Sequence, residues 1–450
     1  MLTPLDAWIC SKIAPSVTGA PNEPLTRSRL EDYQLGRLRA TVEHARSHSP
    51  FYQRQLAGIV DTGLRSLEDI SALPFTTPAD ILAHDLRFLC VSQGEIERVV
   101  TLCSSGTTNA AKRLHFTRQE LELTVDFFHH GMTTLVAPGE RVLILMPGEL
   151  PGSVGDLLLQ GLERLGAQGI LHGIVRDESA AIHQIIVEEI DCLVGLPVQL
   201  LGLVRHADAA TIPPGRIKSV LLSADHVPAA IVREIERAWG CPVFNHYGMT
   251  EMGLGGAVDC RARNGGHLRE ADLYVEIIDP VSGRPLPDGE PGEVVFTTLT
   301  RVGMPLIRYR SGDLSRFIPQ PCPCGTVLKR LARVTGRLAG RVQLASGGRL
   351  GMAELDEALF PLPGLLNFRA AVTVEHNRDC LQVSLLSRAG ASAGLCRAVR
   401  AALEGIPVLR QAVAGDYLRI APPVVMTDSN WQSSSSIKRT LHDYREKKKC

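Results

Sequence analysis

Residues 101–112 read TLCSSGTTNAAK and contain four neighbouring hydroxyl side chains with a glycine among them, and a lysine a few residues later. The central run comprises Ser104, Ser105, Gly106, Thr107 and Thr108. The backbone N–H groups and hydroxyls of such a turn can hold phosphate oxygens, and Lys112 can supply a positive charge. The spacing is not that of the common P-loop, in which the lysine directly follows a glycine and precedes Ser or Thr. Taken alone, the segment could equally be a polar surface turn.

A second polar cluster, NHYGMTE, covers residues 245–251 and directly follows an apolar run that we predict to be a strand. In open α/β sheets, ligands bind at this edge of the strands. Tyr247 could stack on a flat base, Thr250 could bond a phosphate oxygen, and Glu251 could hold Mg²⁺. The alternative is a capped turn between a strand and a helix.

Two further segments carry charged side chains that could act on a ligand. In RYRSGD, residues 308–313, Asp313 could grip paired ribose hydroxyls because a carboxylate accepts two hydrogen bonds at once. In SIKR, residues 436–439, Lys438 stands near the C-terminus, where a lysine is ordinarily a solvated charge.

Four residues have the chemistry of a zinc site. They are Cys260, His267, Cys322 and Cys324. Three thiols and one imidazole suit a closed tetrahedral Zn²⁺ site, although the spacing is not a common zinc-finger spacing. From spacing alone, unrelated thiols are an equal alternative. Cys103 is interpreted as a packing residue, since no motif places a histidine beside it.

The elements that position these residues alternate between apolar runs and amphipathic segments from about residue 100 to 250. The predicted strands are 141–147, 166–173, 191–197, 219–224 and 241–248. Strands separated by helices at this rhythm predict a mainly parallel sheet covered by helices. Upstream, residues 30–58 open with helical periodicity, and Ser66 and Thr77 stand at N-cap spacing from acidic residues.

The pattern changes after residue 265. Gly/Pro turns between apolar runs predict a β-rich subdomain over about 265–336, and residues 337–450 predict a small α+β domain.

The composition limits the classes of function. Lys plus Arg and Asp plus Glu number 48 each, so no domain-wide basic field points to nucleic acid. No apolar run approaches the roughly 18 residues of a membrane span. The eleven cysteines are an odd number and mostly isolated, which predicts reduced thiols and a cytoplasmic location.

Together, in this order, the motifs resemble those of the adenylate-forming superfamily, and most closely the phenylacetate–CoA ligase family. SSGTTNAAK resembles the SSGTTGxPK phosphate loop, HYGMTE the aromatic-YGxTE motif, and RYRSGD the RYRTGD motif. The resemblance spans nearly the whole chain. It implies an α/β fold with a large N-terminal adenylate-forming domain, residues 1–336, that combines helix-covered, mainly parallel sheets with the β-rich subdomain. A small mobile α+β domain, residues 337–450, would follow.

The resemblance also implies roles for individual residues. Residues 104–108 would close over the β- and γ-phosphates of ATP beside Lys112, and Lys438 matches the catalytic lysine. Thr250 and Glu251, with Mg²⁺, would serve the reacting phosphate. The remaining nucleotide-binding candidates are Ser223, Ala224 and Asp225 of the adenine loop, Asn245, His246, Tyr247 and Gly248 of the strand-end motif, and Asp313 with Arg337 at the ribose. His246 would either line the acyl pocket or fill space. Relatives carry similar cysteines and a histidine, which favours a structural zinc site that pins the β-rich subdomain.

The chain departs from the family pattern in three places. Asn109 and Ala111 replace a Gly and a Pro, Leu338-Ala339-Gly340 replaces the usual acidic hinge, and no Gly precedes Lys438 closely. Glycine can absorb a large backbone change, so Gly340 keeps a hinge available. The adenylation half-reaction is therefore better supported than thioester formation.

These observations predict an ATP-dependent carboxylate–CoA ligase that acts through an acyl-adenylate, with an aryl or arylacetic acid such as phenylacetate as substrate. An adenylyltransferase, or a ligase with a non-CoA acceptor, is the first alternative. A non-catalytic nucleotide-binding protein is the second. The expected partners are the acid, ATP and CoA, and the sequence leaves monomer and homodimer both open.

Overall fold

The structure is a computed structural model that describes residues 3–14, 25–59, 63–103, 111–388, 393–426, 431 and 439–445. The chain divides into two compact units. One comprises Met1–Ile174 with Phe244–Val334, and the other comprises Val175–Val243 with Thr335–Cys450. The predicted domains 1–336 and 337–450 remain a prediction.

Six α-helices are described in the first unit: α1 (Pro4–Ile13), α2 (Arg27–His48), α3 (Pro50–Gln55), α4 (Pro78–His84), α5 (Arg118–Met132) and α6 (Val154–Leu165). Thr77 caps α4 as predicted, since its hydroxyl accepts the N–H of Asp80 at 3.2 Å. The predicted N-cap role of Ser66 is wrong. The short helix Glu68–Ala72 follows Leu67 and has no side-chain cap hydrogen bond.

The strands of the first unit are β1 (Ile96–Cys103), β2 (Ala111–Thr117), β3 (Arg141–Leu145), β4 (Gln168–Leu171), β7 (Val243–Tyr247), β8 (Ala257–Asp259), β9 (Gly266–Leu268), β10 (Leu273–Ile278), β11 (Gly292–Thr298), β12 (Tyr309–Ser315) and β13 (Arg330–Leu331). β3 and β4 pair in parallel, whereas β7–β8–β9–β13 and β10–β11–β12 are antiparallel runs. β1 and β2 form an antiparallel pair with Leu102 opposite Lys112.

The core of this unit joins segments that are far apart in the sequence. Leu38, Val42 and Ala45 of α2 are buried in it. They belong to one apolar cluster with the inward side chains of β10, β11 and β12, such as Phe296 and Tyr309. Burial of this apolar surface holds the antiparallel region, and with it the RYRSGD segment, in a fixed place.

The second unit has a parallel α/β part and a separate α+β part. Its elements are α7 (Glu178–Val187), β5 (Cys192–Gly195), α8 (Pro197–Val204), β6 (Ser219–Leu222), α9 (Ala229–Trp239), β14 (Gly336–Arg337), β15 (Val342–Gln343), β16 (Arg349–Leu350), α10 (Met352–Leu359), β17 (Leu365–Glu375), β18 (Arg378–Ser387), α11 (Ala393–Gly405), α12 (Pro407–Ala414), β19 (Leu418–Ile420), β20 (Val424–Met426) and β21 (Leu441–Asp443).

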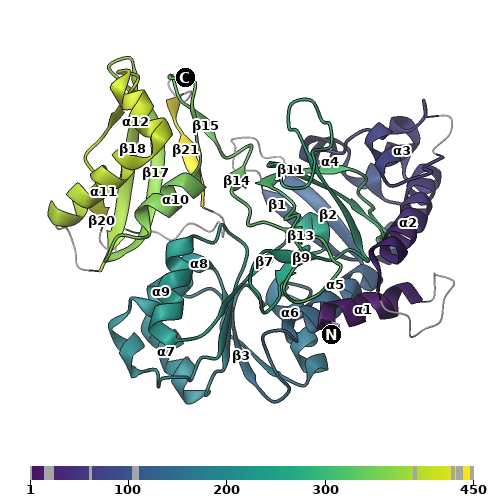
Figure 1. Cartoon of the computed structure of the whole chain (residues 1–450), viewed down its shortest axis with the longest axis horizontal. Coiled ribbons are helices and arrows are strands. Elements are labelled where there is room, and N and C mark those ends of the chain that lie inside the picture. The colour runs from purple at the N-terminus through teal and green to yellow at the C-terminus, as the bar shows by residue number, and fades with distance from the viewer. Residues whose placement is uncertain are drawn as a thin grey trace. The chain divides into compact units, whose positions relative to one another are not determined.

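β5 and β6 pair in parallel, and β17 and β18 form an antiparallel hairpin against which α11 and α12 lie (Figure 1). The predicted α/β class, with helix-covered parallel strands, a β-rich region and a C-terminal α+β region, is confirmed.

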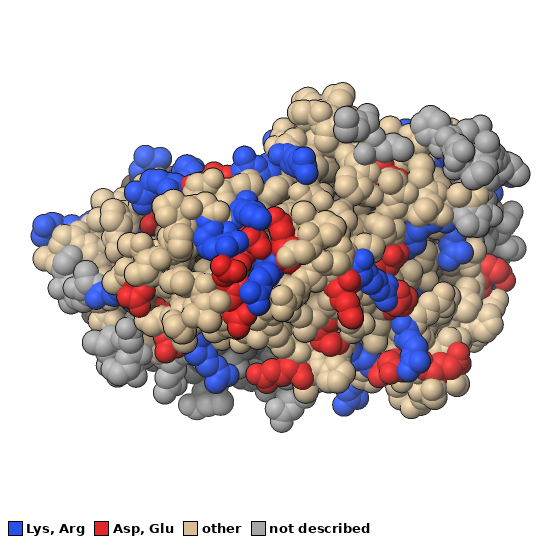
Figure 2. Space-filling view, turned by 90° about the horizontal axis from the view of Figure 1, so that it is seen from below, with Lys and Arg blue, Asp and Glu red and all other residues tan. Residues whose placement is uncertain are grey.

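The surface charges agree with the balanced composition. On the face shown in Figure 2, basic and acidic side chains are interspersed. Among the described residues, no helix is both long and apolar enough to cross a membrane.

Candidate active site

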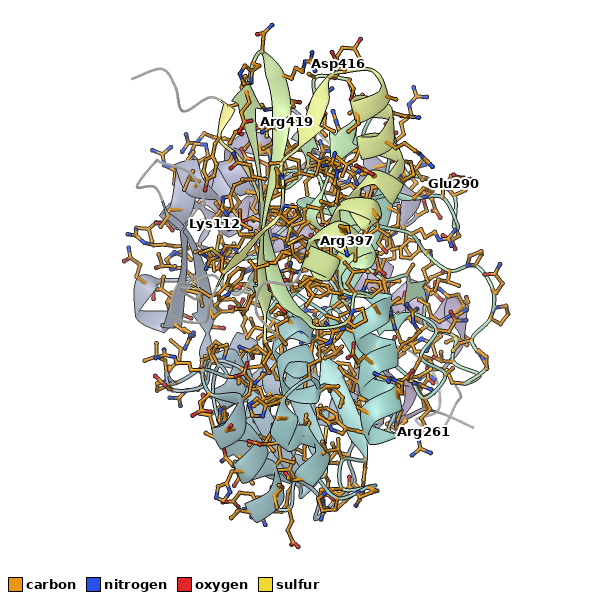
Figure 3. All side chains as sticks on the ribbon, turned by 90° about the vertical axis from the view of Figure 1, so that its left-hand side faces the viewer. Lys112, Arg261, Glu290, Arg397, Asp416 and Arg419 are labelled. Carbon is orange, nitrogen blue, oxygen red and sulfur yellow. The ribbon has the colours of Figure 1, made fainter. Side chains whose placement is uncertain are left out.

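Three segments of the first unit meet around the carboxylate of Glu251. Glu251 lies in the short helix Thr250–Met252 after β7, and its side chain is buried. The ammonium of Lys112, on β2 and labelled in Figure 3, forms an ion pair with Glu251 Oε1. The hydroxyl of Tyr309, at the start of β12, donates to the same oxygen at 3.0 Å. The structure thus brings together two residues that the sequence predicts to act on ATP.

The environment of Glu251 keeps its carboxylate ionised. Burial alone would raise the pKa of Glu251, but the charge and hydrogen bond of Lys112 lower the pKa below its ordinary value. The backbone of Glu251 is fixed as well, because its carbonyl accepts a hydrogen bond from the guanidinium of Arg301 at 3.1 Å. A buried, ionised carboxylate with a fixed backbone is a suitable oxygen ligand for Mg²⁺.

Tyr309 and Arg301 were not among the sequence-predicted site residues. Tyr309 is the second residue of RYRSGD, so the motif itself held the signal for it. Arg301 could not be recognised because no motif contains it. Its guanidinium links Glu251 to the carbonyl of His115, 2.9 Å away, and stacks on Phe116.

A second pair joins the last residue of β7 to the interior of β12. The hydroxyl of Tyr247 donates to Asp313 Oδ2 at 2.9 Å, and the Asp313 side chain is buried. Gly312 adopts a φ of 75°, a conformation that other residues rarely take. A Cβ at Gly248 would lie 2.2 Å from the carbonyl oxygen of Leu254, so only glycine fits after Tyr247.

Asn245 and His246 flank this pair on β7. The N–H of Asn245 donates to Asp259 at 2.9 Å. The ring of His246 lies 6.2 Å from that of Phe127 and 6.1 Å from that of Phe128, and burial lowers the pKa of His246 to about 4. His246 is therefore neutral at pH 7, in an aromatic setting that suits the lining of an apolar pocket.

Four predicted nucleotide-binding residues belong to the second unit. Ser223, Ala224 and Asp225 follow β6, and Ala224 has a φ of 72°. Ala224 thus takes a left-handed backbone conformation that residues other than glycine seldom adopt. Asp225 Oδ2 accepts the N–H of Arg439 at 3.4 Å, and Arg337 is exposed on β14.

The phosphate-loop residues 104–108 and Lys438 lie outside the described residues. The nearest described residues in the sequence are Cys103, Ala111 and Arg439. β1 and β2 flank the loop, with Cys103 opposite Ala111. Arg439, which directly follows Lys438, forms an ion pair with the buried Asp356, and its guanidinium lies over the rings of Phe360 and Phe368.

The four candidate zinc ligands converge in the first unit. The ligand atoms of Cys260, His267, Cys322 and Cys324 all lie within 4.8 Å of one another. Cys260 Sγ lies 3.6 Å from Cys322 Sγ, and Cys324 Sγ lies 3.4 Å from Nε2 of His267. Burial lowers the pKa of His267 to about 4 and raises that of Cys324 to about 12. Grouped thiols of this kind fit Zn²⁺, which would hold them as thiolates beside a neutral imidazole.

Comparison with known proteins identifies relatives of this chain by sequence. A sequence profile described as AMP-binding enzyme matches residues 94–300. The chain is 31% identical over 329 residues to a phenylacetate-coenzyme A ligase of Thermus thermophilus, an alignment that covers 70% of this chain and 72% of the relative. It is 30% identical over 379 residues to the enzyme of that name from Escherichia coli, covering 81% of this chain and 84% of the relative.

A solved structure has the same fold. It is a 2-hydroxyisobutyryl-CoA ligase in the postadenylation state, with a TM-score of 0.77 and 23% identity. The match covers 94% of this chain and 91% of the other.

Proposed function

Because the chain belongs to the phenylacetate–CoA ligase family of AMP-binding enzymes, we propose that it joins an aryl or arylacetic acid, such as phenylacetate, to CoA. Its reaction class is that of the family, the ATP-dependent, AMP-forming ligation of a carboxylic acid to CoA. The observation that carries the proposal is the convergence of Lys112, Glu251 and Tyr309 within one unit that also holds the pair Tyr247 and Asp313.

In the first half-reaction, a carboxylate oxygen attacks the α-phosphorus of ATP, the bond to the bridging oxygen breaks, and pyrophosphate leaves. An anion approaches an anion, so the site must align the reactants and offset charge. Lys112 and residues 104–108 would hold the β- and γ-phosphates. Thr250 would donate to the α-phosphate, and Lys438 would stabilise the charge that develops on the reacting oxygens.

The remaining residues would hold the nucleoside. Asp313 would accept hydrogen bonds from the ribose hydroxyls, with Arg337 nearby, and Tyr247 would stack on adenine. The backbone and side chains of Ser223, Ala224 and Asp225 would border the base, as would Asn245 and Gly248. His246, neutral and among phenylalanines, would line the acyl pocket, where an apolar wall favours an aromatic acid.

Two metals belong to the proposal. Mg²⁺ on Glu251 would neutralise phosphate charge when bound with ATP. Zn²⁺ on Cys260, His267, Cys322 and Cys324 would be structural, because all four ligand positions are filled by the protein.

In the second half-reaction, the CoA thiolate would displace AMP from the acyl-adenylate after residues 337–450 rotate. Leu338-Ala339-Gly340 would serve as the hinge, since glycine tolerates a large change of φ and ψ. We further propose a cytoplasmic location.

The test measures AMP and pyrophosphate release from ATP with aryl, arylacetic and aliphatic acids, each with and without CoA. We expect turnover with an aromatic acid that requires CoA. Release that CoA does not affect would instead favour an adenylyltransferase. ATP binding with no release for any acid would favour a non-catalytic binding protein.

A further inference from the structure

The ammonium of Lys112 already has a partner. It forms an ion pair with Glu251 Oε1 and donates to the Tyr309 hydroxyl at 3.2 Å. The exposed fractions of the two charged side chains are 17% for Lys112 and 9% for Glu251, so water screens the pair only weakly. Each side chain neutralises the charge of the other, and removing one of them would leave an unpaired charge in a largely buried position, which is energetically unfavourable.

This pairing conflicts with the roles that both residues have during adenylation. The proposed function needs the Lys112 ammonium at the ATP phosphates and Mg²⁺ at Glu251. The ammonium and the divalent cation would compete for the same carboxylate oxygen, which also accepts from Tyr309. Both residues can act on ATP only if the ion pair opens.

Resting on the proposed function, we propose that Lys112 is an exchangeable counter-ion. Without nucleotide it neutralises Glu251. When ATP binds with its metal, Mg²⁺ replaces the ammonium on Glu251 and Lys112 moves to the phosphates. No charge is left without a counter-charge in either state, so the metal and the nucleotide favour each other's binding.

The contacts of Glu251 and the side chain of Lys112 indicate which of the two residues moves. Glu251 is held at its carbonyl by Arg301 and at its side chain by Tyr309, whose ring packs 5.3 Å from that of Phe296. Lys112, by contrast, carries its charge on a flexible four-carbon side chain. Tyr309 is thus a positioning residue that keeps the carboxylate oriented while its cationic partner changes.

The exchange predicts an effect on the affinity for metal-free ATP that a lysine without this ion pair would not produce. Metal-free ATP must pull Lys112 away from a carboxylate that then stays unpaired, so the ion pair opposes its binding. Replacing Glu251 with the neutral Gln frees Lys112. The Glu251→Gln variant should therefore bind metal-free ATP more tightly than the wild type does, although it has lost a magnesium ligand.

The experiment is a double-mutant cycle of ATP binding by calorimetry in EDTA, with the wild type, Glu251→Gln, Lys112→Met and the double variant. We expect Glu251→Gln to tighten binding about tenfold, or about 1.4 kcal/mol. In the Lys112→Met background the same change should alter affinity less than about threefold, because the cycle isolates the coupling between the two residues. Glu290→Gln removes an exposed negative charge of the same unit (Figure 3) and should change little.

An equal gain from Glu251→Gln in both backgrounds would overturn the exchange, because it would reflect a general loss of negative charge. Lys112→Gln removes the cation with a different neutral side chain, so Glu251→Gln should again alter affinity less than about threefold in that background; this arm decides the matter if Lys112→Met does not fold. Failure of the wild type to bind ATP even with Mg²⁺ would overturn the proposed function together with this inference. A purely additive cycle alongside CoA-dependent AMP release would overturn the exchange alone.

Discussion

Tyr247 donates its hydroxyl to the buried carboxylate of Asp313 across 2.9 Å, which joins the end of β7 to β12. The N–H of Asp313 donates in turn to the Ser311 hydroxyl at 3.0 Å. The Tyr247 hydroxyl thus fixes the orientation of the Asp313 carboxylate.

Asp313→Asn should therefore weaken ATP binding. Hydrogen bonds to a charged acceptor contribute about 1.5–3 kcal/mol, so we expect the KM for ATP to rise about tenfold to a hundredfold. Tyr247→Phe removes only the internal bond and should have a smaller effect. The measurement is the ATP dependence of pyrophosphate release, and an unchanged KM in Asp313→Asn would exclude the ribose role.

Much of the fold could be predicted from the sequence. The predicted strands at 141–147, 191–197 and 219–224 are confirmed because buried parallel strands form unbroken apolar runs. The N-cap predicted at Ser66 does not form because the short helix begins one residue later, after Leu67, with no side-chain cap hydrogen bond. The N–H of Ser66 donates to Asp69 just as the N–H of Thr77 donates to Asp80, so the spacing could not distinguish the two positions.

The candidate site was predicted as a set of motifs and not as a set of contacts. Lys112 and Glu251 are 139 residues apart in the chain, and only the packing of β2 and β12 around the short helix of Glu251 brings them together. The motifs name the residues, but the ion pair depends on tertiary structure. The same holds for Arg301, whose carbonyl partners are set by the fold.

We expect the purified chain to contain about one zinc ion and Cys322→Ser to lose it. Because the metal would join the turn at Cys322 and Cys324 to Cys260 and to β9, its loss should lower the melting temperature by about 5 °C or more. Elemental analysis and thermal melting provide the readouts. Cys10→Ser, which changes a thiol outside the cluster, should keep both values. Freshly purified protein without zinc would remove the site.

Lys438→Ala should reduce acyl-adenylate formation by about a hundredfold or more and leave ATP affinity within about threefold. The reason is that the lysine would act mainly on charge that develops in the transition state. Single-turnover pyrophosphate release measures the first quantity and calorimetry the second. Lys329→Ala, a change at a half-buried lysine, serves as the control. Full activity in Lys438→Ala would contradict the ligase assignment.

His246 should make the protein less stable in acid. Burial among Phe127 and Phe128 lowers the pKa of His246 to about 4, whereas its unfolded value is about 6.5. Between pH 6.5 and pH 4, His246 therefore binds a proton in the unfolded chain but not in the folded chain. Protonation thus favours the unfolded state, and the free energy of unfolding falls as the pH falls over this range. The full effect is about 3 kcal/mol. His246→Gln cannot titrate, so its denaturant midpoint should fall less over this range than that of the wild type. Parallel curves for the two proteins between pH 7 and pH 4.5 would show that the folded chain protonates His246 freely, and would argue against a neutral imidazole in the acyl pocket.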